Sequence, residues 1–444
     1  MSDPQPEPTS SGPRGGRAGG RSELPPRRLP WLTRAALALS RAAADASRRS
    51  GRGRGAQVGG KLAYRLRPGT LRDLADGRQT ALVSATNGKS TTATLLAAAV
   101  RSRGPTAFNA TGANMEEGLV VALDADRRAP YAVLETDEAY LGVVVEATRP
   151  RVLLLMNLSR DFLERGVRAK QLAAHWRETI AAIDWPCVVV ANTDDPLVAW
   201  SVRAARQLVW VAGEDSWHAD SMVCRDCLVR LDRSNASWRC PHCGMERETP
   251  DWWVAPSADG WVAHGPDDVA VLLPASLPGR ASRVNSLFAV AAATAMDVSP
   301  EAAVQRVADV ENVDGRYAPH VYGQHVVRVL LAKNPASWTE SLATVEEDRK
   351  PSLVLAMSSR GAGGGQDTAM LWDAPFERLA GRAVTTAGSR GDELALRLAA
   401  AGVEVRRGSA DVVAEIGAQP PGAVDLIANW PAFNAVLDRI GRGT

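Results

Sequence analysis

Short apolar runs alternate with longer segments of helical composition from about residue 80 onward. Runs of this length that are apolar throughout predict β-strands buried on both faces. We expect such strands at residues 80–83, 131–134, 152–156, 188–190 and 208–211, with helices between them, most clearly over 93–100 and 169–183. Strands that alternate with helices in this way are typical of a parallel, doubly wound α/β sheet.

The alternation restarts after residue 313 and predicts a second α/β unit. Its strands are expected at residues 326–332, 353–356 and 424–427, and its helices at 337–347, 393–401 and 432–440. Residues 31–312 would then form the first domain, with helices at 31–46 and 287–296. Residues 313–444 would form a smaller, Rossmann-like α/β domain. Residues 1–30, which are rich in Arg, Gly and Pro, are expected to be a disordered tail.

Charge is distributed unevenly along the 444 residues, a length that predicts two or three domains. The formal net charge is +2, yet residues 1–56 contain eleven arginines against four acidic residues, so the remainder carries about −5. A mildly acidic folded part argues against a nucleic-acid partner, although the arginine-rich tail could contact nucleic acid or anionic lipid. Because neither an 18-residue apolar run nor a signal-peptide profile is found, we expect a cytoplasmic enzyme.

The stretch with the most specific chemistry runs from Leu82 to Thr92 and reads Leu-Val-Ser-Ala-Thr-Asn-Gly-Lys-Ser-Thr-Thr. A strand leads into it and a helix leads out, so it predicts a loop whose backbone N–H groups surround phosphate oxygens. Lys89 would reach the terminal phosphates, and the Ser90 hydroxyl would bind Mg²⁺. The match to the strict P-loop pattern is partial, because Val83 stands where that pattern has its first glycine.

Acidic residues follow the second expected strand, in Glu135-Thr136-Asp137-Glu138. Acids at the carboxyl end of a buried strand, in the same domain as a phosphate loop, indicate a magnesium position; capping of the next helix is the other interpretation. Two further strand ends are polar, at residues 157–161 and 192–196, and we expect them to face the ligand as well. A glycine-rich loop at residues 358–367 follows a strand of the second unit.

Four of the five cysteines have metal-ligand spacing, in Cys224-x2-Cys227-x12-Cys240-x2-Cys243. Each Cys-x2-Cys pair can form a knuckle that presents two thiolates to one tetrahedral ion, so the pattern predicts a zinc site. Four thiolates leave no open position for water, which favours a structural role. The segment 215–250 therefore predicts a zinc ribbon inserted into the first domain. Cys187 lies in an apolar run and is interpreted as a core residue.

Taken together, these motifs resemble the Mur ligases and, more closely, the MurT family of lipid II isoglutaminyl synthase subunits, from about residue 35 to the C-terminus. The loop at residues 85–92 is similar to the family's Gly-Thr-Asn-Gly-Lys-Thr/Ser-Thr-Thr, which explains the replaced P-loop glycine. Many members also carry the four-cysteine ribbon. Further matches occur in family order, at 112–115, 135–139, 157–161, 192–196, Asn285, 315–316, 331–336 and 390–398.

The resemblance implies an ATP-dependent amide ligase that uses ATP, Mg²⁺ and structural Zn²⁺. In this family, ATP phosphorylates the α-carboxyl of the stem-peptide D-glutamate of lipid II. Ammonia from a separate GatD-type glutaminase then displaces phosphate to give D-isoglutamine. The expected location is the cytoplasm, with a peripheral contact with the inner face of the membrane that holds lipid II.

The resemblance also implies roles for individual residues. The phosphate-binding set is Thr86, Asn87, Gly88, Lys89, Ser90 and Thr91; Ser90 and Glu135 would hold Mg²⁺; Asn285 would contact adenine and Arg316 the nucleotide; Lys89, Asp367 and Asp373 would be catalytic. Asp367 is preferred over Asp373 as the carboxylate at the ammonia end, and either could instead cap a helix.

The chain departs from the family after the second C-terminal strand. The usual Asn-Asp and Asp-Gly-Arg-Asp-Val-Ser-Trp are replaced by Ser358-Ser359-Arg360 and glycine-rich sequence, so the chain is a divergent member. This difference leaves open a Mur-like ligase that amidates another carboxylate. A non-catalytic ATP- and zinc-binding protein is a further alternative, which the intact Lys89, Ser90 and Glu135 disfavour.

Overall fold

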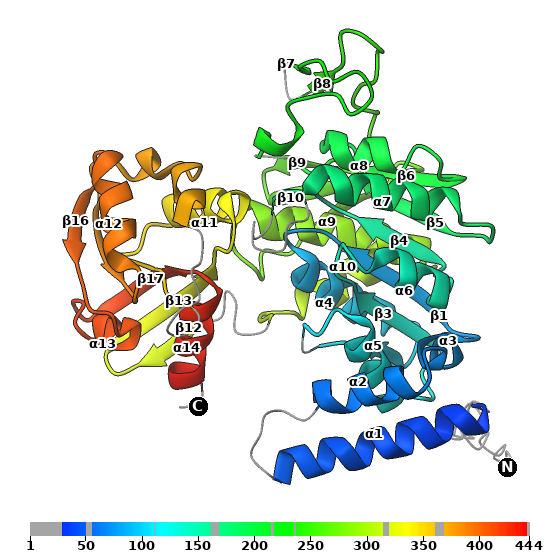
Figure 1. Ribbon diagram of the computed structural model, residues 1–444. Coiled ribbons are helices and arrows are strands. Elements are labelled where there is room, and N and C mark those ends of the chain that lie inside the picture. The colour runs from blue at the N-terminus through cyan, green and yellow to red at the C-terminus, as the bar shows by residue number, and fades with distance from the viewer. Residues whose placement is uncertain are drawn as a thin grey trace, which may run out of the picture.

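The structure is a computed structural model that describes residues 29–49, 56–110, 112–160, 168–214, 217–234, 237–313, 319–359 and 368–441. Nearly all of the expected tail at 1–30, and the candidate residues Arg316 and Asp367, lie outside the described residues. Two six-stranded sheets organise the rest, and a small ribbon projects from the first (Figure 1). Within the described ranges, no helix is both long and apolar enough to cross a membrane.

The first sheet has the strand order β2-β3-β1-β4-β5-β6, and every pair in it is parallel, as expected. Alternate residues along each strand enter different cores: Leu82 and Leu153 point to one face, Val83 and Leu154 to the other. Short β2 was not anticipated, because three residues carry too little pattern. The strands are β1 (Gln79–Ser84), β2 (Thr106–Phe108), β3 (Tyr131–Glu135), β4 (Val152–Leu155), β5 (Val188–Asn192) and β6 (Gln207–Val211).

Helices cover both faces of this sheet, which makes it doubly wound. One face packs against α4 (Lys89–Val100), α9 (Gly279–Ala295) and α10 (Pro300–Ala308). The other packs against α3 (Thr70–Ala75), α5 (Glu116–Ala125), α6 (Leu141–Thr148), α7 (Ala169–Ala181) and α8 (Pro196–Ser201). Because the strands are apolar on both faces, the sheet can be stable only between two such layers.

Two N-terminal helices, α1 (Trp31–Arg49) and α2 (Ala56–Leu66), pack against each other at the edge of this domain (Figure 1). The expected helix at 31–46 is present and three residues longer. The glycine-rich composition of residues 51–60 did not suggest α2. A Cβ at Gly60 would lie 2.2 Å from the carbonyl oxygen of Glu117, so α2 approaches α5 too closely for any side chain there.

The second sheet has the order β12-β13-β17-β14-β15-β16, parallel except for edge strand β12. The three apolar strands predicted from the sequence correspond to β13, β14 and β17. The polar or short strands β12, β15 and β16 were not predicted. The strands are β12 (Pro319–Tyr322), β13 (His325–Leu331), β14 (Ser352–Ala356), β15 (Ala383–Ala387), β16 (Glu404–Arg407) and β17 (Gly422–Ala428). The helices are α11 (Pro335–Glu347), α12 (Gly391–Ala400), α13 (Val412–Gly417) and α14 (Trp430–Ile440).

The cysteine segment folds as a separate small unit around the antiparallel pair β7 (Asp232–Ser234) and β8 (Ser237–Arg239). An antiparallel sheet that the sequence reading did not predict follows it, with strands β9 (Trp253–Ser257), β10 (Gly260–His264) and β11 (Ala270–Leu272). This sheet leads into α9. The N-terminus of α9 in turn contacts α11 of the second α/β unit through the Arg280–Glu340 ion pair.

Candidate functional site

The phosphate loop joins β1 to α4 at the carboxyl edge of the first sheet. Gly88 has a left-handed backbone, with φ 84°, and precedes the helix. The first hydrogen bond of that helix runs from the N–H of Thr92 to the carbonyl of Gly88, so the N–H groups of residues 89–91 point outward at its N-terminus. This arrangement is a general anion-binding geometry.

Asn285 of α9 lies against this loop. A Cβ built at Gly88 would lie 2.6 Å from Asn285 Oδ1, so a side chain at position 88 would displace it. Asn285 is only 5% exposed. The structure therefore brings the expected adenine-binding residue to the phosphate loop; its contact with adenine stays a prediction.

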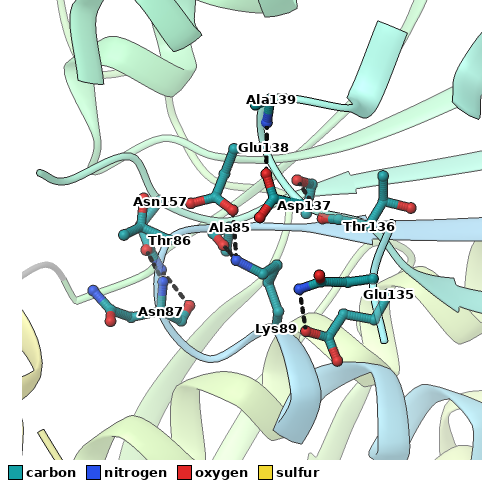
Figure 2. A network of polar contacts seen from close by, with 12 residues as sticks. Ala85, Thr86, Asn87, Lys89, Glu135, Thr136, Asp137, Glu138, Ala139 and Asn157 are labelled. Atoms are coloured by element: carbon teal, nitrogen blue, oxygen red, sulfur yellow. Dashed lines mark hydrogen bonds and ion pairs between the residues drawn. The ribbon is translucent and has the colours of Figure 1, made fainter. Parts of the chain in front are cut away.

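The Thr86 side chain and the Asn87 backbone make hydrogen bonds within the protein (Figure 2). Thr86 Oγ1 accepts a hydrogen bond from the Ser159 N–H, at 3.0 Å. The Asn87 N–H donates to Asn157 Oδ1 at 2.9 Å, and Asn157 Nδ2 donates back to the Asn87 carbonyl at 3.0 Å. These contacts hold the phosphate loop against the loop that follows β4.

Lys89 is buried at the start of α4, with 7% of its surface exposed. Its Nζ lies 2.6 Å from Glu138 Oε2 and also donates to the carbonyl of Ala85 (Figure 2). Burial alone would lower the pKa of the Lys89 ammonium, but the carboxylates of Glu138, Glu135 and Asp137 outweigh it and raise that pKa above its ordinary value. The lysine is therefore fully charged at neutral pH.

Glu135 and Asp137 complete a buried cluster after β3. Glu135 Oε1 accepts a hydrogen bond of 3.3 Å from Asn114 Nδ2, and Asp137 Oδ1 accepts one of 3.0 Å from the N–H of Ala139. Helix α6 starts two residues later with no side-chain cap, so helix capping does not account for these acids. Asp137 braces the turn before that helix.

The cluster carries more negative than positive charge. Glu135, Asp137 and Glu138 are each less than 9% exposed, and all three interact electrostatically with Lys89. One ammonium cannot compensate three buried carboxylates, and a carboxylate-rich site of this kind suits a divalent cation that prefers oxygen ligands. The residues present therefore fit a magnesium ion, and magnesium binding by Glu135 stays a prediction.

The acids of the polar segment at 192–196 make hydrogen bonds and an ion pair within the protein, and that this segment faces the ligand stays a prediction. Asp195 Oδ1 caps α8 by accepting from the Leu197 N–H at 2.8 Å, and its Oδ2 accepts from the Leu158 N–H at 2.7 Å. Asp194 pairs with Arg247 of the cysteine segment. The acids serve local folding because α8 starts directly at Pro196 and because the ribbon packs beside them.

The carboxyl edge of the second sheet reaches the phosphate loop through Asn334. Its side chain caps α11 by accepting from the Ser337 N–H at 2.9 Å, and its Nδ2 donates to Asn87 Oδ1 at 3.1 Å. This link was not anticipated, although residues 331–336 had been recognised as a motif. A side-chain hydrogen bond between residues 247 positions apart produces no local pattern in the sequence from which it could be predicted.

Asp373 lies at the junction of three parts of the chain. Its Oδ2 is 3.2 Å from Arg160 Nη1, and Arg160 Nε is 3.2 Å from Asp220 Oδ1 at the base of the ribbon. The pair Arg160–Asp373 is partly exposed, at 36% and 41% of the two side chains. Asp373 is thus held against the first domain and does not contact Lys89 or Glu135. Its catalytic role stays a prediction, as do those of Asp367 and Arg316.

The four predicted metal ligands come together. The Sγ atoms of Cys224, Cys227, Cys240 and Cys243 all lie within 4.8 Å of one another. Cys224 Sγ and Cys243 Sγ are 3.7 Å apart, which matches the roughly 3.8 Å edge of a tetrahedron with Zn–S bonds of about 2.3 Å. The donor set therefore fits a four-coordinate zinc ion.

The two knuckles contain the same kind of backbone turn. In the first, the Leu228 N–H donates to the Cys224 carbonyl; in the second, the Gly244 N–H donates to the Cys240 carbonyl. Both Leu228 and Gly244 are left-handed, with φ 58° and 73°. Glycine suits this conformation, and Leu228 adopts it at a cost.

The ribbon is fixed to the first domain. Cys224, Trp238 and Cys240 belong to the same apolar core as Leu197 of α8. Trp238 Nε1 also donates to the carbonyl of Thr193 at 3.0 Å. The ribbon therefore packs against the first domain.

Comparisons with known proteins agree with this architecture. Residues 83–234 match the family model described as Mur ligase middle domain, and residues 331–433 match the model described as MurT ligase C-terminal. The chain is 26% identical to the "Lipid II isoglutaminyl synthase (glutamine-hydrolyzing) subunit MurT" of Staphylococcus aureus, over 83% of this chain and 88% of that one.

Solved Mur ligases have the same fold at low identity. MurF from Acinetobacter baumannii superimposes with a TM-score of 0.62 at 16% identity, covering 86% of this chain and 80% of that one. MurF ligase from Thermotoga maritima in complex with ADP gives 0.61 at 15%, covering 86% and 84%. With the two family models matched in the same order as the two sheets, this chain is a divergent MurT-type member of the Mur ligases, a family of ATP-dependent ligases.

Proposed function

We propose that this protein is the synthetase subunit that activates the α-carboxyl of the stem-peptide D-glutamate of lipid II for amidation. ATP would supply the phosphoryl group, and a GatD-type glutaminase would supply ammonia. The observation that carries the proposal is the buried Lys89, at the start of α4 and among three carboxylates, in a chain whose C-terminal region is of the MurT type. The S. aureus relative is named as a subunit of a glutamine-hydrolysing synthase.

The phosphate loop would hold ATP by its backbone. The outward N–H groups of residues 89–91 would donate to the β- and γ-phosphate oxygens, and Lys89 would exchange its contact with Glu138 for the γ-phosphate. Because Thr86 and Asn87 are bonded to the loop after β4, their contribution would be to hold the loop in shape. The T. maritima MurF with the same fold binds ADP, which supports a nucleotide here.

Magnesium would be held by the Ser90 hydroxyl and the Glu135 carboxylate. When bound, the ion neutralises charge on the phosphates during transfer. The Asn114 side chain, hydrogen-bonded to Glu135, would orient that carboxylate. Asp137 and Glu138 keep the surroundings negative, which favours the cation.

Two displacements would complete the reaction. In the first, an oxygen of the substrate carboxylate attacks the γ-phosphorus, the bond to ADP breaks, and an acyl phosphate forms. In the second, ammonia attacks the acyl carbon, phosphate leaves with the C–O bond electrons, and the nitrogen loses a proton. The chain's part is to position reactants and stabilise charge, with Lys89 as the main cation.

The second α/β domain would close over the nucleotide through Asn334 and Arg316, with Asn285 at the adenine side. Asp367 would be the carboxylate at the ammonia end, with Asp373 as the second choice. The four-cysteine ribbon would bind one structural zinc ion. Its packing against α8, directly after β5, would keep the polar loops of the first sheet in place.

Reconstitution tests this function. The chain, co-expressed with a GatD-type partner, is incubated with lipid II, ATP, Mg²⁺ and glutamine, and the product is analysed by mass spectrometry. We expect amidated lipid II and one ADP per amide formed. Omission of glutamine should stop amidation and ammonium chloride should restore it, because ammonia is the nucleophile.

The divergent residues 358–367 favour one other candidate, a Mur-like ligase that amidates a different carboxylate. In that case the same mixture would give no amidated lipid II, although Lys89-dependent ATP binding would persist. A purified chain that binds ATP and zinc but turns over no carboxylate at all would instead indicate a non-catalytic protein.

Zinc is tested separately on the purified chain by elemental analysis. We expect one zinc per chain in the wild type and none in a Cys240→Ser/Cys243→Ser variant. Cys187→Ser is the matched control, since Cys187 lies outside the cluster, and it should retain the metal.

A further inference from the structure

Helix α1 has one face against the protein and one face that nothing among the described residues covers. Its buried residues, Thr33, Ala36, Leu37, Ser40 and Ala44, recur at intervals of three and four and form the side that packs against the domain. Figure 1 shows α1 at the outer edge of the molecule, beyond α2. The opposite face is therefore directed away from the fold.

This outer face is apolar along its length. Trp31, Leu32 and Leu39 are 67%, 46% and 56% exposed. Four exposed alanines continue the same stripe at helical spacing, namely Ala35, Ala38, Ala42 and Ala46. Single exposed apolar residues are ordinary, but a tryptophan and two leucines on one helical face need an explanation.

Arginines accompany the stripe. Arg34 and Arg49 are exposed on α1, and residues 27–54 contain eight arginines against one acidic residue, Asp45. The rest of the folded chain is mildly acidic, so this basic charge is confined to one region. A helix with Trp and Leu on one side, arginine beside them, and low overall hydrophobicity is typical of a helix that lies in a membrane interface.

We propose that the outer face of α1 docks on an anionic membrane surface, with Trp31, Leu32 and Leu39 in the headgroup region and Arg34 and Arg49 against lipid phosphates. The indole ring of Trp31 is amphipathic and suits the interface. The alanines allow the helix to lie close to the surface. The arginines upstream of the helix add long-range attraction, which makes docking dependent on salt.

The composition of this face favours a lipid surface over a protein partner. An apolar stripe made mainly of alanine offers little shape for a specific protein partner, whose interface would need large buried side chains at its centre. A lipid surface needs only apolar area and basic charge, and both are present here. Membrane docking by α1 does not depend on the phosphate loop or on the proposed reaction.

Co-sedimentation with vesicles tests it, with the full chain and no ATP or substrate. We expect binding to phosphatidylcholine vesicles that contain phosphatidylglycerol, weak binding to pure phosphatidylcholine, and loss of binding at high salt. A Trp31→Ser/Leu39→Ser variant should bind about tenfold more weakly, since two exposed apolar side chains no longer enter the lipid. An Arg34→Gln/Arg49→Gln variant should show a weaker preference for the anionic lipid, since the other arginines of residues 27–54 remain.

Leu396→Ser is the matched control, because Leu396 is 63% exposed on α12 of the other domain. It should bind vesicles like the wild type. Equal binding by Trp31→Ser/Leu39→Ser and wild type would overturn the proposal and assign any affinity to the arginine-rich tail. A dimer in light scattering that this variant disrupts, or a glutaminase complex that it weakens, would also overturn it by assigning the face to a protein.

Discussion

Both sheets end in loops at the carboxyl ends of parallel strands, but the side chains in those loops differ between the two sheets. The first edge carries a buried cluster of charged groups, Lys89 with Glu135, Asp137 and Glu138. At the second edge, the described residues that follow β14 and β17 are joined by neutral groups. Asn429 accepts from the Ser358 N–H at 3.0 Å and donates back to its carbonyl at 2.9 Å.

The second sheet also buries charge, but in the body of the sheet. Asp425 of β17 is fully buried and pairs with Arg328 of β13 at 2.8 Å. Burial raises the pKa of Asp425, and the Arg328 partner opposes that rise. This pair joins neighbouring strands, whereas the cluster at the first edge has three carboxylates around one ammonium. The proposed function accordingly assigns nucleotide and metal to the first sheet and closure to the second.

Loss of the lysine should produce the largest effect. Lys89→Met should lower the rate of ATP-dependent amidation by about 10²–10³-fold, because the transferred phosphoryl group loses its principal cation. It should also destabilise the fold by about 3–5 kcal/mol, since Glu138 would remain buried without its partner. Steady-state kinetics and urea unfolding measure the two effects.

A double variant separates the two roles of Lys89. Lys89→Met/Glu138→Gln should recover part of the stability, because the carboxylate that Lys89 contacts directly is neutralised while Glu135 and Asp137 stay buried, and activity stays lost. Lys350→Met serves as control, since Lys350 pairs only with exposed Asp348 in the second domain. If the double variant regained activity together with stability, Lys89 would be a structural residue and the comparison of the two edges would fail.

A smaller effect is expected when the partner alone is changed. Glu138→Gln should lower the pKa of Lys89, because the Glu138 carboxylate is the largest contribution that raises it. A lysine with a raised folded pKa stabilises the fold below its unfolded pKa of about 10.4, and this stabilisation is lost as pH rises through the folded value. The variant should therefore lose stability at lower pH than the wild type.

Urea unfolding from about pH 8 to about pH 11 measures this shift. Activity at neutral pH should fall far less than in Lys89→Met, because the lysine itself remains. Glu146→Gln, an exposed acid on α6 that pairs with Arg72, is the control and should leave the alkaline limb unchanged. Identical alkaline profiles for Glu138→Gln and wild type would show that the ion pair contributes nothing to stability.

Most of this first edge could be predicted from the sequence, because its chemistry lies in short contiguous motifs. The strand, loop and helix around Gly88-Lys89-Ser90 and the acids after β3 are local patterns, and the cysteine spacing predicted a group of four thiols that the structure brings together. The apolar strands of both sheets were found because burial on two faces leaves a run that no helix period explains.

Contacts between residues far apart in the sequence could not be predicted. Nothing local distinguishes Glu138, which binds Lys89, from Asp194 and Asp195, which cap a helix and hold the ribbon. Helix α2 was missed because Gly59 and Gly60 predict a turn, whereas close packing on α1 and α5 requires glycine there. Polar edge strands such as β16 show too little alternation to be recognised.

The contact between the two edges can be tested at Asn334. Asn334→Ser should keep the cap on α11, since serine caps well, but it cannot reach Asn87. Asn334→Ala should lose both and cost about 1 kcal/mol more than Asn334→Ser. A double-mutant cycle with Asn87→Ala should give about 0.5–1.5 kcal/mol for the bond between the edges.

Unfolding free energies and the KM for ATP provide the readouts. If the second edge contributes closure, Asn334→Ser should raise the KM for ATP several-fold and leave kcat nearly unchanged. Asn429→Ser, at the same edge but at a residue that bonds Ser358, should not alter the KM. Equal KM values for both serine variants would mean that the 3.1 Å contact has no part in nucleotide binding.

The smallest effect is expected at Asp373. The Arg160–Asp373 pair is partly exposed on both sides, so Asp373→Asn should change the free energy of unfolding by less than about 1 kcal/mol, and salt should remove the difference. Because Asp373 pairs with Arg160 and does not contact Lys89 or Glu135, we expect amidation to fall less than about tenfold, against a loss of at least about 10²-fold for Asp367→Asn. Parallel kinetics with glutamine and with ammonium chloride distinguish the two acids, since a residue at the ammonia end should affect the glutamine-dependent reaction most. A hundredfold loss of amidation in Asp373→Asn with unchanged stability would make Asp373, beside Arg160, a catalytic carboxylate. The second edge would then take part in the reaction as well as in the structure.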